Sequence, residues 1–165
     1  MNKKKQLTKN LYISIPILLV VGLIVWSVAQ PKPGEFVASQ GNQHIESVDS
    51  AHMEYSTTPP TSGPHVGSKA NWGIHSEQIA DELQIHNLED GGVIVHYLPG
   101  TDYETIDRLK TIVSGYSTSV ILEPYEPMDT MIALTAWGRI DRMDELDEER
   151  IKTFIDTFKG IDHHR

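Results

Sequence analysis

The chain has 165 residues, with 14 Lys and Arg against 23 Asp and Glu, and no cysteine. Four of the basic residues and none of the acidic ones precede residue 30, so the remainder carries ten basic against 23 acidic residues, a net charge of −13. This charge argues against nucleic acid and anionic membrane surfaces as partners. Without cysteine there are no disulfides, and a metal site must use His, Asp, Glu or Met.

Residues 11–29 form a long uncharged, mostly apolar run. As a helix it would reach about 28 Å, close to the thickness of a hydrocarbon core. All four lysines of residues 1–10 precede it, which favours a cytoplasmic basic tail and an extracytoplasmic remainder. The pattern predicts a single-pass transmembrane helix, or an uncleaved signal anchor, in the cell membrane. A signal peptide cleaved after Ala29 is the alternative.

Residues 30–50 are rich in Pro, Gly, Ser, Gln and Asn and lack periodicity, which predicts a flexible linker. The extracytoplasmic domain is then expected over residues 51–160, with 161–165 as a tail. About 110 residues suffice for one small core.

The domain opens with a stiff loop at 57–65, because its three prolines fix φ and remove donors. The loop ends on His65, either solvated on a surface turn or presented toward the core. Residues 83–86 alternate in hydropathy and predict a short strand. Residues 93–98 are rich in β-branched and aromatic types, and the Pro-Gly step after them ends a strand.

Thr101 and Glu104 suggest a capping box that begins a helix ending near Ser114. Strands are expected at 120–122 and 131–137. A last helix follows, with an apolar stripe at i, i+3, i+4 and i+7 formed by Ile151, Phe154, Ile155 and Phe158. This order predicts an α+β domain with a small mixed or antiparallel sheet and helices mostly on one face.

Candidate ligands lie around the strand at 93–98. His86, Glu89 and Asp90 precede it within one turn, and His96 lies on it. A buried imidazole needs a polar partner or a metal, so His96 is either a satisfied core histidine or a ligand. With His65, these five residues form the predicted metal site. Imidazoles with a carboxylate suit zinc, copper, manganese or iron, and copper or zinc is the expected cofactor if one binds.

Other histidines are weaker candidates. His75 is a further candidate ligand outside the five residues of the predicted site. His163 and His164 fall in the terminal tail and are expected to be mobile rather than part of a preformed site.

Four motifs resemble a bacterial family known as domain of unknown function 3105. They are Pro-Pro-Thr-Ser-Gly-Pro-His at 59–65, Trp-Gly-Ile at 72–74, His-Asn-Leu-Glu-x-Gly-Gly-Val at 86–93 with His-Tyr at 96–97, and Leu-Thr-Ala-Trp-Gly-Arg at 134–139. The resemblance implies a membrane-anchored, exported domain and no settled activity. Val66 and Asp90 stand where the family pattern usually has histidine, and each removes an imidazole.

Three functions remain open from the sequence. The first is a membrane-tethered extracytoplasmic metal-binding domain. The second is an exported protein-interaction or structural domain without metal, its protein partner undefined. The third and least favoured is a metal-dependent enzyme, which would need an open coordination position beside a pocket.

Overall fold

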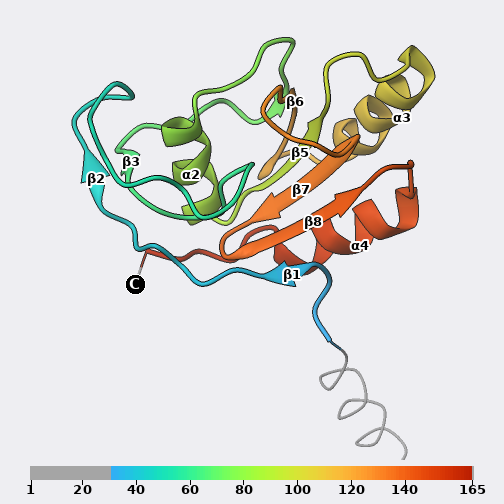
Figure 1. The fold of residues 1–165 in the computed structure, drawn as a ribbon. Coiled ribbons are helices and arrows are strands. Elements are labelled where there is room, and N and C mark those ends of the chain that lie inside the picture. The colour runs from blue at the N-terminus through green and yellow to red at the C-terminus, as the bar shows by residue number, and fades with distance from the viewer. Residues whose placement is uncertain (1–30, 165) are drawn as a thin grey trace, which may run out of the picture. The chain divides into compact units, whose positions relative to one another are not determined.

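The computed structural model describes residues 31–164, and the chain from Pro33 onward forms one compact unit (Figure 1). Its centre is a six-stranded sheet in the order β1-β8-β7-β5-β6-β4. The strands are β1 (Glu35–Phe36), β4 (Gly73–Ile74), β5 (Val93–Tyr97), β6 (Val120–Pro124), β7 (Ile132–Ala136) and β8 (Arg139–Met143). β4, β6 and β5 pair in parallel and the remaining pairs are antiparallel, so the predicted mixed sheet is confirmed.

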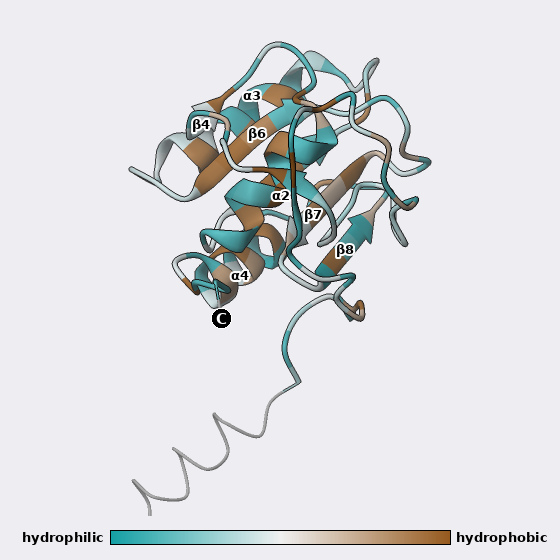
Figure 2. Cartoon of the chain, turned by 90° about the vertical axis from the view of Figure 1, so that its left-hand side faces the viewer, coloured by the Kyte–Doolittle hydropathy of each residue, from teal (hydrophilic) through white to brown (hydrophobic). Residues whose placement is uncertain are grey.

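The three helices described in residues 31–164 are α2 (Asp81–Glu89), α3 (Tyr103–Ser114) and α4 (Glu148–Phe158). α3 and α4 pack on one face, where Val95 and Leu122 meet Phe154. α2 covers the other face, where its Leu88 packs on Ile94 and Ile121. Figures 1 and 2 show these two layers around the sheet. Two of the three helices thus share a face, in an α+β domain.

α2 replaces the short strand predicted at 83–86. The helix buries Gln84, Asn87 and Glu89 beside Ile85 and Leu88. Polar and apolar residues therefore share its inner face, and the apolar stripe that indicates a helix in a sequence is missing. The chance alternation over four residues gave the wrong element.

The other two helices match their predicted positions. α3 is capped by Asp102, whose carboxylate accepts from the Thr105 amide at 2.9 Å, one residue after the predicted Thr101 cap. α4 is capped by Asp147, and its four predicted stripe residues are all buried. Both caps satisfy a backbone donor that has no partner within the helix.

Residues 33–50 do not behave as the predicted linker. β1 pairs with β8, and β2 (His44–Ile45) pairs in parallel with β3 (His65–Val66) beside α2. Between β1 and β2, the backbone amide of Gln40 donates to the Ser62 hydroxyl at 3.0 Å. The segment was predicted as a linker because it is polar and lacks periodicity. Its strands are only two residues long and its other contacts are made by single polar groups, so neither leaves a pattern in the sequence.

The predicted membrane segment at 11–29 lies outside the described residues. Within residues 31–164, none of the helices has the length and apolar character needed to span a bilayer.

Candidate metal centre

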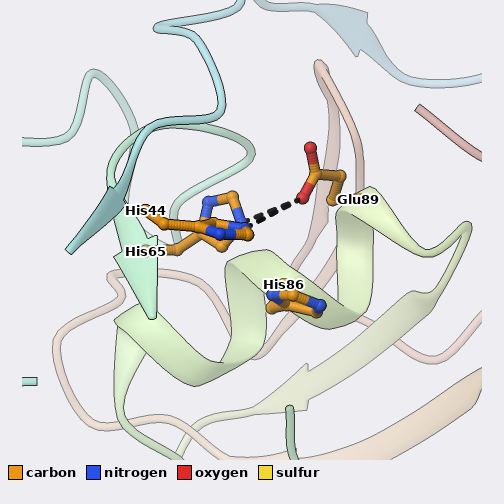
Figure 3. Close-up of side chains that lie close together, drawn as sticks. All are labelled: His44, His65, His86 and Glu89. Atoms are coloured by element: carbon orange, nitrogen blue, oxygen red, sulfur yellow. Dashed lines mark hydrogen bonds and ion pairs between the residues drawn. The ribbon is translucent and has the colours of Figure 1, made fainter. Parts of the chain in front are cut away.

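Three imidazoles and one carboxylate from separate segments converge at the C-terminal end of α2 (Figure 3). They are His44 on β2, His65 on β3, and His86 and Glu89 on α2, and we call them the inner group. One ligand atom from each lies within 4.8 Å of the others. His65 and Glu89 are buried, whereas 53% of the His44 side chain is exposed. His86 and Glu89 stand at i and i+3, which places both on one face of the helix.

The His65 ring is held in one tautomer. Its Nδ1 lies 2.9 Å from the Gly63 carbonyl oxygen, which can only accept, so Nδ1 carries the proton. In the neutral ring Nε2 then has a lone pair, and it lies 3.0 Å from Glu89 Oε2. Two acceptors therefore face each other in a buried position. The contact is favourable when a proton or a metal cation lies between the two atoms.

His86 is held in the same way. Its Nδ1 lies 3.0 Å from the Val66 carbonyl oxygen, which leaves Nε2 to bind a ligand. Burial lowers the pKa of His86, so the ring stays neutral to a lower pH than an exposed histidine. A carbonyl that holds the Nδ1 proton is the usual outer partner of a metal-binding histidine.

The two oxygens of the Glu89 carboxylate have different partners. Oε1 accepts from the Asn42 side-chain amide at 2.8 Å, and Oε2 faces His65 and, at 3.9 Å, the Nε2 atom of His44. Glu89 is the last residue of α2, where the helix dipole favours a cation. One oxygen is thus oriented by a donor and the other is presented to the imidazoles.

The proline-rich loop positions His65. Residues 59–66 are all buried, so the surface-turn interpretation is wrong and the loop presents His65 to the interior. The Tyr55 hydroxyl donates to the Pro64 carbonyl at 2.7 Å. Gly63 has φ of +133°, and a Cβ there would lie 3.0 Å from the Tyr55 ring. Glycine therefore allows the turn whose carbonyl orients His65.

The rest of the 86–92 motif ties α2 to its surroundings. Buried Asn87 accepts from the Ala70 amide at 2.9 Å and donates to the Ala70 carbonyl at 3.0 Å. Gly91 has φ of +78°, and a Cβ on Gly92 would lie 2.8 Å from the Trp72 ring. The Gly-Gly step is needed because the chain passes directly beneath Trp72 as it turns into β5.

A second set of potential ligands adjoins the first. It consists of His86, Asp90 and His164, and we call it the outer group. His164 Nε2 lies 3.4 Å from both Glu89 Oε2 and Asp90 Oδ1. The Asp162 carboxylate accepts from His164 Nδ1 at 2.7 Å and raises the pKa of that ring.

The C-terminal tail, which was expected to be mobile, packs against α2 beside the inner group. The His163 amide donates to the Glu89 carbonyl at 2.9 Å, and the His163 ring stacks on Trp137 with centroids 5.9 Å apart. The Gly160 amide donates to the Gly91 carbonyl at 2.7 Å. These contacts bring His164 to the ligand cluster, so the tail is part of the candidate site.

His96, a predicted ligand, is in neither group. Its Nε2 lies 2.9 Å from the Thr135 hydroxyl, its Nδ1 lies 3.0 Å from Glu123 Oε1, and its ring packs edge-on against Tyr125. It is a core histidine with polar neighbours of its own. His75 is also separate: it is half-buried, belongs to neither group, and its Nε2 contacts the Asn71 carbonyl.

Of the five predicted ligands, the structure therefore places His65, His86 and Glu89 in the inner group and Asp90 in the outer group. Sequence reasoning missed His44 and His164. His44 is a single histidine in a polar, aperiodic segment, and only its pairing with β3 brings it to His65. The sequence around it holds no local signal of this role.

The comparisons with known proteins give one match. A family model, described as "Protein of unknown function (DUF3105)", matches residues 47–164, which include both groups except His44. Neither curated proteins nor solved structures match the chain. Because the match spans most of the chain and holds all four of the motifs noted in the sequence, the chain belongs to the DUF3105 family.

Proposed function

We propose that this protein is a membrane-tethered extracytoplasmic metal-binding domain, and that the inner group holds a zinc or copper ion. The observation that carries the proposal is the 3.0 Å approach of His65 Nε2 to Glu89 Oε2 with the His65 proton held on Nδ1. A metal cation between the two atoms is bound by both, in place of the proton that otherwise joins them.

The spacing of the group suits a single ion. Ligand atoms about 2.0 Å from a tetrahedral zinc lie about 3.3 Å from one another. The Nε2 atoms of His65 and His44 lie 3.0 and 3.9 Å from Glu89 Oε2, on either side of that value. Three imidazoles and one carboxylate are ligands that zinc and Cu²⁺ accept. Four protein ligands fill a tetrahedral shell, which favours binding over catalysis at this centre.

The tether and the location rest on the sequence. The apolar run at 11–29 with lysines only before it supports a single-pass anchor and an extracytoplasmic domain. The acidic composition of the exported part suits a cationic ligand.

The test is thermal unfolding of the full chain in mild detergent, with and without Zn²⁺ or Cu²⁺, at pH 7.5 and pH 5. An ion that binds only the folded state adds about 2.7 kcal/mol of stability at one hundred times Kd, so Tm should rise at pH 7.5. The rise should be smaller at pH 5, because protons compete for the imidazoles.

Variants locate the site. His44→Gln and His65→Ala should each remove most of the metal-dependent rise, and His75→Ala, which removes a histidine outside both groups, should not. His96→Gln should lower the starting Tm yet leave the response to metal. If the parent does not respond to either ion, the inner group is structural and the interaction-domain function replaces metal binding.

A further inference from the structure

We propose that the outer group is the position through which the metal enters and leaves the inner group, so that the protein exchanges its ion with the surroundings. The inference rests on the proposed function. It assigns to His86, Asp90 and the tail residue His164 a transient metal position between solvent and the buried ligands.

The outer group repeats the construction of the inner one. Asp90 Oδ2 is held by the Lys69 ammonium, while Oδ1 faces the Nε2 atoms of His164 at 3.4 Å and His86 at 3.8 Å. This is the division seen in Glu89, with one oxygen oriented by a donor and the other facing imidazoles. His164 has its Nδ1 held by Asp162, which leaves Nε2 to bind a metal. The ligand atoms lie within 4.8 Å of one another.

The two groups share His86, and this sharing excludes full occupancy of both. His86 Nδ1 is committed to the Val66 carbonyl, so a single atom, Nε2, serves either position. One ion can keep its bond to His86 while Asp90 and His164 are exchanged for the ligands of the inner group. Each position contains one carboxylate and neutral imidazoles, so the step needs no change in the charge of the ligands.

The outer ligands are more exposed than the buried inner ones, so an ion from solvent reaches the outer group first. The side chains of His65 and Glu89 are 0% and 1% exposed, whereas those of Asp90 and His164 are 18% and 43% exposed. The inner position has four ligands and holds the ion more tightly, and the outer position has three and faces solvent. His44 is also exposed, but the carboxylate beside it is the buried Glu89. The outer group instead contains the half-buried Asp90 and lies beside the exposed Asp162, and these two carboxylates attract a cation first.

The experiment measures zinc exchange of the full chain in detergent. Loading of the metal-free protein and release of zinc to a coloured chelator are followed by rapid mixing, and Kd and stoichiometry by competition. The parent should bind one zinc. His164→Ala and Asp90→Asn should slow loading and release together by about tenfold, because loss of an intermediate position raises the same barrier in both directions. Kd should then stay within about twofold of the parent, and His75→Ala should match the parent throughout.

Three results would overturn the inference while metal binding stands: parent rates in both outer variants, two zinc ions per chain, or a loss of affinity in His164→Ala as large as in His65→Ala. The last two would mean a two-metal centre and a permanent ligand, respectively. A parent that binds no zinc would instead remove the proposed function, and the exchange position with it.

Discussion

The two buried histidines, His65 and His96, show that a nearby carboxylate does not by itself place an imidazole in a group of potential metal ligands. Both rings are fully buried with a carboxylate oxygen 3.0 Å away. His65 Nδ1 donates its proton in a hydrogen bond to the Gly63 carbonyl, so in the neutral ring Nε2 faces Glu89 with a lone pair. His96 Nε2 instead lies 2.9 Å from the Thr135 hydroxyl, and its Nδ1 lies 3.0 Å from Glu123 Oε1 without hydrogen-bond geometry. His65 stands with His44, His86 and Glu89 in the inner group, whereas His96 belongs to neither group.

Asp81 gives a residue-scale prediction about pH. Burial raises its pKa to about 6, against the opposing hydrogen bond from the Tyr125 hydroxyl. The folded state thus favours the protonated acid. Its contribution to stability is complete below the unfolded pKa near 3.9 and is lost as pH rises through about 6.

Asp81→Asn removes the charge and leaves an acceptor for Tyr125. In urea unfolding without metal, the variant should exceed the parent in unfolding free energy at pH 7.5, by at most about 3 kcal/mol, and match it near pH 4. A variant less stable than the parent at pH 7.5 would show that the ionised carboxylate stabilises the fold.

At the scale of elements, α4 and α2 are stabilised differently. α4 buries a purely apolar stripe against the sheet, with Phe154 and Phe158 packed edge to face at 4.8 Å between centroids. α2 buries the polar residues Gln84, Asn87 and Glu89. Their side chains form hydrogen bonds with the Ile79 carbonyl, the Ala70 amide and the Asn42 side chain, respectively. α4 therefore depends on apolar burial, and α2 depends on polar groups being paired.

Phe154→Ala tests the α4 core. The side chain is fully buried, so its loss should cost about 3–5 kcal/mol of unfolding free energy, a large part of a small domain's stability. Thr153→Ala, at the exposed neighbouring position, is the matched control and should change stability little. Equal melting temperatures for Phe154→Ala and the parent would mean that α4 is peripheral to the fold.

At the scale of the whole molecule, the proposed orientation predicts which end of the chain a protease can reach. Protease added to intact, wall-stripped cells should remove an epitope placed after Arg165 and spare one placed before Met1, because the lysines before residue 11 favour the cytoplasm. Permeabilised cells should lose both epitopes. Protection of the C-terminal epitope in intact cells would reverse the proposed orientation.

The sequence by itself determined those elements whose signal is local. The strand at 93–98, the capped helix ending at Ser114 and the apolar stripe of the last helix were predicted nearly in place, because periodicity and capping depend on neighbours within a few residues. His65, His86 and Glu89 were singled out because they stand in motifs whose prolines and glycines mark unusual backbone, and their role as ligands stays a prediction.

Only the tertiary structure decided which residues make up the candidate metal centre. His44 and His164 stand 120 residues apart in sequence and reach the end of α2 through a two-residue strand pair and a docked tail. His96 was predicted as a ligand because it lies on a buried strand, where an imidazole needs a polar partner or a metal, yet its polar neighbours are Thr135 and Glu123 within the core. Ligand sets are made by distances in space, and hydrogen bonds between distant segments, which no local pattern encodes, set those distances.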